Sequence, residues 1–424
     1  MTLLLLGAFA ALLLLGVPIA FAMIGSALLV IAIEGFPLSI FAQRVSSGIQ
    51  SFPLLAVPLF ILAGNLMNES GMSERLFAFA RALIGHIRGG LAHVNIVASV
   101  LLSGISGSSI ADCAAVTRVF VPEMQKAGFS RGFSIALTAS SATLAPIIPP
   151  SILMVIYGWQ ANVSIGDMFV AGILPGLLIA ALLLGLSGVL AKVRNFPRDD
   201  AFSGARLWRE FKRAVWALLL PVVIVGGFRA GIFTATEVAA MAAAYALLVG
   251  LVIYRTLSPR HLVDALTSTA KDTAAILMLV AAAAPFAWIL GINQAPQVIL
   301  GFVTSITSDP LAILLIINLM LLVLGMFMET LAIIIILVPI LLPLVNSIGV
   351  DLVHFGIIRI LNLLIGQLTP PVGVLMFVAC SIARAPMSEF LREGWPFLIA
   401  LVVALGLIIL IPDLSLTLPN LLKG

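Results

Sequence analysis

The sequence contains very little charge. Only 9% of its 424 residues are Asp, Glu, Lys or Arg, whereas 62% are hydrophobic, and the mean hydropathy is +1.23. A soluble domain carries about 25% charged residues, so this chain cannot cover a globule with a solvated surface. Intrinsic disorder is excluded by the same numbers, because disordered chains are poor in apolar residues. The composition therefore predicts a polytopic membrane protein.

The residues and motifs of enzyme active sites are also scarce. The four histidines, His86, His93, His261 and His354, are scattered, with no HExxH motif and no Cys/His cluster. The two cysteines lie in apolar stretches, which indicates buried thiols and no disulfide framework. The sequence has no GxSxG elbow and no P-loop. We therefore expect no enzymatic activity, no cofactor and no ATP hydrolysis, so that any energy comes from an ion gradient.

What the chain does contain is a series of apolar segments of membrane-spanning length. A hydrocarbon core of about 30 Å is crossed by about 20 apolar residues in a helix. Simple spans are predicted at residues 3–33, 52–67, 169–192, 214–228, 237–254, 273–291 and 396–411. The first has no basic segment before it and no cleavage-like break, so we expect a retained span. We expect a kink in it at Pro18, because proline removes a helix hydrogen bond.

Four other apolar segments are interrupted in the middle. Two of them, residues 92–124 and 310–344, are predicted to be re-entrant helical hairpins, with tips at 104–109 and 325–330. The other two are predicted to be broken transmembrane helices, 130–159 with a break at 144–150 and 354–382 with a break at 367–371. The fold class predicted is thus an all-α membrane protein with irregular backbone at membrane depth.

The interruptions recur with the same spacing. Asp112 and Glu329 each precede a proline by ten residues, and Pro150 and Pro371 each precede a phenylalanine by equal distances. This indicates two copies of one unit, roughly 1–192 and 236–413. The extra span between them turns the second copy upside down, and such inverted repeats are typical of secondary transporters.

The basic residues predict the orientation. With the spans counted as above, the loops on one side hold 17 Lys and Arg, and the other side holds 3. The first side is therefore expected to be cytoplasmic. The first hairpin then opens from the cytoplasm and the second from the opposite face. On the cytoplasmic side, residues 73–88, 208–216 and 259–271 are predicted to be amphipathic interfacial helices, with solvated linkers as the alternative.

The interruptions concentrate polar groups at membrane depth, where irregular backbone must be satisfied by protein or by a water-filled cavity. Free carbonyls and hydroxyls there suit a sodium ion, and helix N-termini suit a carboxylate. Candidate substrate-binding residues near the two tips are Ser109, Asp112, Arg118, Glu329 and Thr330. The alternatives are that the carboxylates only stabilise their helix N-termini, that the arginine snorkels to the cytoplasmic side, and that the hydroxyls bond to their own helices.

Three motifs together resemble a known family. They are Ser106-Gly107-Ser108-Ser109 with Asp112, the sequence Ala-Pro-Ile-Ile-Pro-Pro-Ser at 145–151, and Leu-Thr-Pro-Pro-Val-Gly at 368–373. Over essentially the whole chain, the sequence resembles the DctM-like large membrane subunit (M subunit) of tripartite ATP-independent periplasmic (TRAP) transporters. The resemblance implies an elevator-type symporter of the bacterial inner membrane, driven by sodium. Its substrate would be a small organic acid, such as a dicarboxylate, a sugar acid or a sialic acid.

The resemblance also implies two partners, a small four-helix membrane subunit (Q-type) and a periplasmic substrate-binding protein (P-type). Because Met1 leads directly into the first span, we expect the small subunit to be a separate chain, and we expect a periplasmic C-terminus. In an elevator the parts would be scaffold spans with an arm helix (1–91), the first half of the transport domain (92–160), scaffold spans with connectors (161–304), the second half of the transport domain (305–384), and a last scaffold span with a tail (385–424).

The resemblance further implies two sodium sites. One would be formed by the first tip and the first break, with Ser103, Ser106, Ser108, Thr143 and Ala145. The other would be formed by the second tip and the second break, with Gly325, Met328, Gly366 and Thr369. The substrate carboxylate would lie between the tips.

An ion or solute channel subunit is the alternative outside this class, and an intramembrane enzyme is a more distant one. A channel also needs polar residues at the midplane, but it would show a continuous polar stripe or a charged ring in place of paired hairpins.

Overall fold

The computed structural model describes residues 1–198, 201–229 and 233–423, without the side chains of Ile105, Ser106, Arg229 and Lys423. Within these ranges every named element is a helix, and the only strand-like feature is an isolated antiparallel bridge between Arg88 and Arg198. Eight of the described helices are long and apolar enough to cross a membrane. The predicted all-α polytopic membrane fold is confirmed.

The first copy of the repeat runs to the end of α10. Its elements are α1 (Thr2–Leu14), α2 (Ile19–Ile33), α3 (Leu38–Ile49), η1 (Phe52–Leu55), α4 (Ala56–Glu69), α5 (Met72–Ile84), α6 (Gly90–Ser106), α7 (Ser109–Lys126), α8 (Arg131–Ser141), η2 (Ala142–Leu144), α9 (Ile152–Ala161) and α10 (Ile165–Val193). The extra span α11 (Gly204–Arg229) follows.

The part of the chain predicted to be the second copy again contains a pair of helices followed by a broken helix. Its elements are α12 (Ala235–Leu248), η3 (Val249–Ile253), α13 (Pro259–Ile292), α14 (Ala295–Ile306), α15 (Pro310–Phe327), α16 (Thr330–Ser347), α17 (Leu352–Gln367), α18 (Val374–Ile382), α19 (Met387–Leu410) and α20 (Asp413–Lys423). The predicted hairpins are α6–α7 and α15–α16, and the predicted broken helices are α8–α9 and α17–α18. Both hairpins and both breaks are therefore present where the sequence placed them.

The first predicted span is wrong in form. Residues 3–33 make two helices, α1 and α2, which pack against each other. A Cβ atom built on Gly25 would lie 3.2 Å from Leu12 Cδ1, so the chain folds back between the two helices. The reversal is local: Gly16 has a left-handed backbone (φ +81°), and Pro18 caps α2. Helices of 13 and 15 residues are about 20 Å long, too short to cross the hydrocarbon core alone.

Two predicted interfacial connectors are also wrong as separate helices. Residues 208–216 belong to α11 and residues 259–271 belong to α13, each continuous with the span that follows. At 34 residues, α13 is about 50 Å long, so its amphipathic start extends beyond the apolar core that its second half crosses. The third connector does form a separate amphipathic helix, α5.

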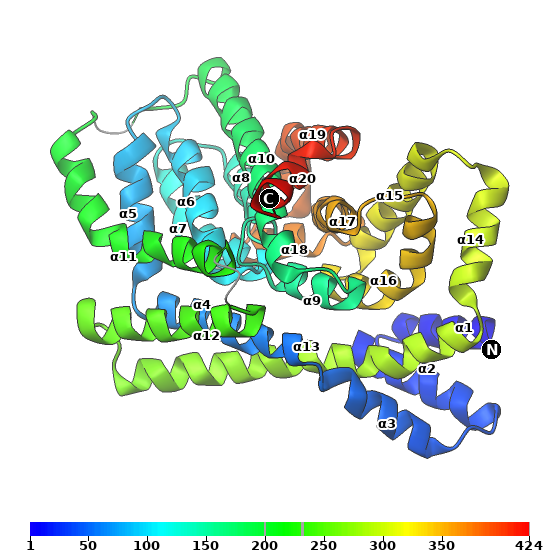
Figure 1. The fold of residues 1–424 in the computed structure, drawn as a ribbon. Helices are drawn as coiled ribbons and strands as arrows, with labels where there is room; N and C mark the ends of the chain where they lie inside the picture. Colours follow the sequence, from blue (N-terminus) through cyan, green and yellow to red (C-terminus); the bar gives the residue numbers. More distant parts are fainter. Residues whose placement is uncertain (199–200, 230–232, 424) are drawn as a thin grey trace.

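The helices fall into two packed groups, which Figure 1 shows from one side. In the first group α4 packs against α12 and α13, and α13 packs against α2 and α3. Asn65 Nδ2 in α4 donates a hydrogen bond to Thr269 Oγ1 in α13, at 3.0 Å. We call this group the scaffold layer.

The second group contains both hairpins and both broken helices, and we call it the hairpin body. The copies interlock within it, because α9 packs against α16 and α18 packs against α7. Helices α10 and α19 pack against each other, α10 also against α9 and α17, and α19 also against α8 and α17. These contacts place α10 and α19 beside the hairpins, although both lie in segments that the sequence assigned to the scaffold.

Candidate functional site

Each hairpin tip lies against the break of its own copy. At the first tip Gly107 has a left-handed backbone (φ +59°), and a Cβ atom there would come within 2.7 Å of the Pro150 carbonyl oxygen. At the second tip the carbonyl oxygen of Met326 accepts a hydrogen bond from the backbone N–H of Gly373, at 3.1 Å. Irregular backbone from four parts of the chain is thus gathered in one region of the hairpin body.

A small cavity of about 80 Å³ lies where these parts meet. The start of α7, the start of α9 and the start of α16 line it, together with the end of α17 and Ile276 of α13. Three helix N-termini therefore face one cavity. Their partial positive charges and free N–H groups favour an anion.

Several polar side chains line this cavity. Thr330 and Gln367 are almost fully buried, at 2% and 0% exposure. The Thr330 hydroxyl and both amide atoms of Gln367 have no hydrogen-bond partner within the described residues. Ser108, the buried Ser109 and Glu329 complete the polar lining. A buried polar atom without a partner costs free energy, so its presence at a cavity points to a ligand or to water.

The cavity is too small for an organic acid as it stands. Pockets for small molecules usually measure about 300–1,000 Å³, and this one holds only a few water molecules. A substrate of sialic acid size would require the two tips to separate. The structure therefore has the tips closed on each other.

The two candidate carboxylates do not occupy equivalent positions. Asp112 lies one turn into α7 and is 4% exposed, whereas Glu329 is the residue immediately before α16 and lines the cavity. The equal spacing to a later proline suggested equivalence, but α16 begins closer to its proline than α7 does. Of the two, Glu329 is the one placed to meet a ligand.

The candidate Arg118 is exposed on α7 and does not line the cavity. This position agrees with the snorkelling alternative. Arg359 in α17 is the largest fully buried side chain of the described residues, and its Nη2 donates to the Ile333 carbonyl oxygen at 2.9 Å. It therefore links α17 to α16, away from the cavity lining.

Among the first set of predicted sodium ligands, Ser103, Thr143 and Ala145 are all buried. Ser103 Oγ donates to the Val100 carbonyl oxygen at 2.5 Å, and Thr143 Oγ1 donates to that of Ser140 at 2.7 Å. Both hydroxyls thus bond to their own helices and keep oxygen lone pairs free to accept. Ser108 Oγ caps α7 by accepting from the Ala111 N–H at 3.4 Å. The side chain of Ser106 lies outside the described residues.

In the second set, Gly325 and Gly366 are in direct backbone contact. A Cβ atom on Gly366 would lie 2.8 Å from the backbone of Gly325, so only glycine permits this crossing of α15 and α17. Thr369 Oγ1 donates to the Ile365 carbonyl oxygen at 2.8 Å, and Met328 caps the end of α15. Of this set, Gly325 of the second tip and Gly366 of the second break are therefore in contact.

Comparisons with known proteins identify the family. A family model described as the DctM component of tripartite ATP-independent periplasmic transporters matches residues 6–414. The chain belongs to the DctM family. The sialic acid TRAP transporter large permease protein SiaM of Vibrio cholerae is 41% identical over 410 residues, 96% of each chain. The C4-dicarboxylate TRAP transporter large permease protein DctM of Pseudomonas aeruginosa is 39% identical over 88% of this chain and 87% of its own.

Solved structures agree on the fold. The YdaH transporter of Alcanivorax borkumensis superposes with a TM-score of 0.67 at 15% identity, over 89% of each chain. MtrF of Neisseria gonorrhoeae superposes with a TM-score of 0.61 at 14% identity, over 87% of this chain and 84% of that one. The family match and the relatives named as large permease proteins show that this DctM component is a multi-pass membrane permease subunit and not an enzyme.

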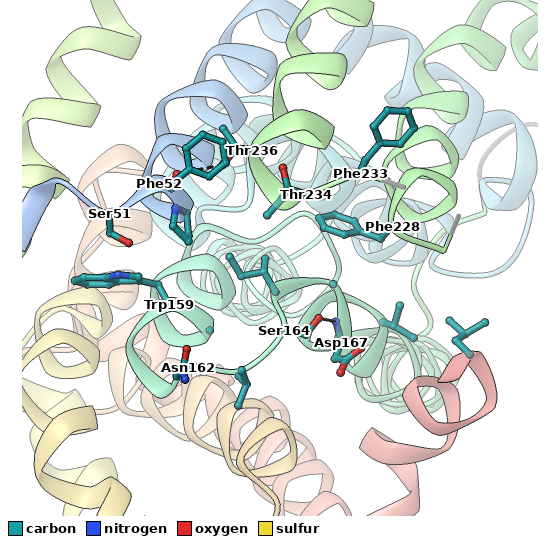
Figure 2. A pocket seen from close by; sticks show the side chains of 18 residues that line it. Ser51, Phe52, Trp159, Asn162, Ser164, Asp167, Phe228, Phe233, Thr234 and Thr236 are labelled. Atoms are coloured by element: carbon teal, nitrogen blue, oxygen red, sulfur yellow. Dashed lines mark hydrogen bonds between the residues drawn. The ribbon is translucent and has the colours of Figure 1, made fainter. Parts of the chain in front are cut away.

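The DctM component also contains a much larger cavity, of about 720 Å³, away from the tips. Figure 2 shows Phe52, Trp159 and Phe228 around it, with Ser164 and Asp167 at the start of α10. It lies at helix ends, on the face predicted to be opposite the cytoplasm. No residue predicted for sodium or substrate lines it. Size therefore does not identify the transport site in this DctM component.

Several residues that line the tip cavity were not among the predicted site residues, and Gln367 and Ile276 are two of them. Gln367 was assigned to a break but not to a site, although a polar amide at the start of the break was a usable signal. Ile276 of α13 carried no signal, because an isoleucine in an apolar span resembles every other lipid-facing or core residue.

Proposed function

We propose that this DctM component carries out sodium-coupled symport of a small organic acid across the bacterial inner membrane. The observation that supports the proposal is the cavity where both tips and both breaks meet. Three helix N-termini line it, and the side chains of Gln367 and Thr330 have no hydrogen-bond partner within the described residues. A substrate carboxylate would bind at these N-termini, where backbone N–H groups point toward it.

Sodium would bind beside this cavity in two places. A sodium ion takes hard oxygen ligands, and backbone carbonyls freed at a break supply them. The first place would be between Ser103, Ser106, Ser108, Thr143 and Ala145. The second would be between Gly325, Met328, Gly366 and Thr369, where glycines let two backbones approach closely. Sodium bound in either place would hold a tip against its break, in reach of the substrate.

An elevator movement fits this arrangement. The cavity is lined by the hairpin body on most sides and by Ile276 of the scaffold layer on one side. Movement of the hairpin body along α13 would carry the cavity across the membrane while the scaffold layer stays in place. In this proposal α10 and α19 move with the hairpins, because their contacts are with those helices.

Two partners complete the proposal. Family membership implies a small membrane subunit and a periplasmic binding protein. The isethionate TRAP transporter permease protein DctMQ of Oleidesulfovibrio alaskensis matches 95% of this chain over only 64% of its own length. The name DctMQ and the additional length of that relative support a small membrane subunit as a partner of this chain.

The test is uptake by proteoliposomes that contain this chain and its small subunit, with binding protein loaded with a dicarboxylate or a sialic acid. Uptake should saturate with loaded binding protein and should stop when sodium is replaced by choline or when the sodium gradient is collapsed. Uptake that ignores sodium would contradict symport. Flux that never saturates would indicate a channel.

A further inference from the structure

A second polar cavity, of about 460 Å³, lies at the other end of the hairpin body. Arg88, Lys192 and Arg198 line it, together with His86 and His93, and no carboxylate of the described residues does. These residues come from the turn between α5 and α6, from α6, from the end of α10, and from the segment after α10. This is the face that the basic residues predict to be cytoplasmic.

The backbone holds two of the arginines side by side. Arg88 and Arg198 form the isolated antiparallel bridge, and the Gly89 N–H donates to the Pro197 carbonyl oxygen at 2.9 Å. A Cβ atom on Gly89 would lie 2.6 Å from Ala191 Cβ, so the turn is pressed against α10. Side chains directly opposite in an antiparallel pair are close neighbours, and like charges there are destabilising. The fold therefore contains a repulsion that a bound anion would relieve.

The basic residues of this cavity differ from others on the same face. Arg131 pairs with Glu389, Arg194 pairs with Glu393, and other nearby arginines also have carboxylate partners. Arg88, Lys192 and Arg198 have no such partner within the described residues. Asp199 and Asp200 follow in the sequence and lie outside those residues.

The depth of the cavity points to a lipid. Helix α10 has 29 residues, about 43 Å, so its last turns, which carry Lys192, emerge at the headgroup region. Next to the cavity α10 exposes Val189 and Val193, at 59% and 73%. Apolar side chains there can contact acyl chains while the basic groups contact a phosphate. We propose that this cavity binds the phosphate headgroup of an anionic phospholipid.

The test compares two double variants that each lose one arginine and one lysine. Arg88→Gln/Lys192→Gln alters the cavity, and Arg260→Gln/Lys271→Gln removes equal charge from α13, outside it. Thermal unfolding in detergent is followed while phosphatidylglycerol, phosphatidylethanolamine or inorganic phosphate is added. Phosphatidylglycerol should raise the midpoint of the wild type and of the α13 variant. In the cavity variant its half-saturating amount should rise by on the order of tenfold or more.

The other arms separate the remaining explanations. If both double variants lose the phosphatidylglycerol effect on the unfolding midpoint equally, the effect comes from diffuse surface charge, and the proposed site is wrong. If inorganic phosphate or phosphatidylethanolamine raises the unfolding midpoint as much as phosphatidylglycerol does, the ligand of the cavity is not an anionic lipid. In Asp199→Asn/Asp200→Asn, phosphatidylglycerol should still raise the unfolding midpoint. If it raises the midpoint only in this variant, the two carboxylates already neutralise the cavity in the wild type, and the proposal is wrong. If the cavity variant does not fold, Arg198→Gln should weaken lipid binding in the same direction, and unchanged binding in it would overturn the proposal.

Discussion

Two buried side-chain amides on α17, Gln367 and Asn362, differ in their hydrogen bonding. The Gln367 amide is fully buried at the tip cavity and has no partner within the described residues. Asn362, one and a half turns earlier on α17, is also buried, but its Nδ2 donates to the side-chain oxygen of Asn318 at 2.8 Å and to the Asn318 carbonyl at 2.9 Å. One helix thus carries a buried amide that bonds to a neighbouring helix, Asn362, and a buried amide at the cavity without a partner within the described residues, Gln367.

We predict that Gln367→Leu leaves the thermal unfolding midpoint nearly unchanged and weakens substrate uptake. Replacing an unpartnered amide with an apolar group of similar size loses no hydrogen bond within the protein. The matched control Asn362→Leu should lower the unfolding midpoint, because it leaves buried groups of Asn318 without a donor, a loss of about 1–3 kcal/mol. Measuring both properties for both variants decides the roles. If Gln367→Leu lowers the unfolding midpoint and leaves uptake normal, the amide stabilises the fold and does not bind substrate.

The predicted sodium sites can be tested at two hydroxyl residues, Ser106 at the first tip and Thr369 at the second break. In Ser106→Ala and in Thr369→Ala the half-saturating sodium concentration of uptake should rise by on the order of tenfold or more, since a ligand to a charged group contributes about 1.5–3 kcal/mol. Thr304→Ala is the control, because Thr304 Oγ1 makes the same kind of intrahelical bond, to Leu300 at 2.9 Å, on an exposed part of α14. If both site variants follow the control curve, sodium binds elsewhere.

At the scale of elements, each hairpin is fastened to its broken helix by buried polar contacts. In the first copy Asn95 of α6 donates to Thr138 of α8 at 2.8 Å and accepts from Ser141 at 2.8 Å. In the second copy the Asn362–Asn318 contact joins α17 to α15 in the same way. The first helix of each hairpin is therefore bonded to the broken helix of its own copy. In the second copy Arg359 also bonds α17 to the second hairpin helix, α16.

The arm helix α5 makes aromatic contacts with the extra span α11 and with α7 of the hairpin body. Phe79 lies 5.9 Å from Phe211 of α11, and Phe77 lies 5.2 Å from Phe120 of α7, between ring centroids. If α5 is static, a cross-link from Phe79→Cys to Phe211→Cys should leave uptake intact. The matching cross-link from Phe77→Cys to Phe120→Cys should block uptake while substrate binding persists, because it ties the arm to the hairpin body. The opposite pattern would place α5 in the moving part.

The sequence predicted those elements that glycine and proline mark. Both hairpin tips and both breaks were found because irregular backbone at membrane depth requires such residues. The α1–α2 hairpin was not found, since a kinked span and a folded-back pair have the same apolar composition and differ only at Gly16–Pro18. Helices α3, α14 and α20 were missed as well. Of these, α14 could have been predicted from the repeat, because it precedes the second hairpin as α5 precedes the first.

At the scale of the whole molecule, the convergence of the four interruptions could be predicted only in outline. An inverted repeat implies that equivalent irregular points meet, but it does not say which side chains line the space. Long-range packing decided that: α9 against α16 and α18 against α7 bring Pro146, Ile152 and Gln367 to one cavity with the tips. Long-range packing also places α10 and α19 beside the hairpins, and no local sequence pattern in those two helices predicts this.

The described residues form no separate domain outside the helices that could capture a dilute solute. The described connections between helices are short, and the tip cavity of about 80 Å³ is too small for an organic acid. A cavity of this size needs a conformational change before substrate enters, and a ligand shifts such an equilibrium only through its differential affinity for the open state. A soluble binding protein that docks on the open state could supply that affinity together with the substrate.

We therefore predict that the purified chain alone, in liposomes with an inward sodium gradient, shows uptake near background. Adding the small membrane subunit should not be enough, and uptake should appear when substrate-loaded binding protein is present as well. The measurement is initial uptake of one labelled acid in the three compositions at equal amounts of the chain. A denatured binding protein with the same total substrate is the control for free substrate. Rapid sodium-dependent uptake by the chain alone would contradict the tripartite assignment of function and would mean that the tips open to free substrate unaided.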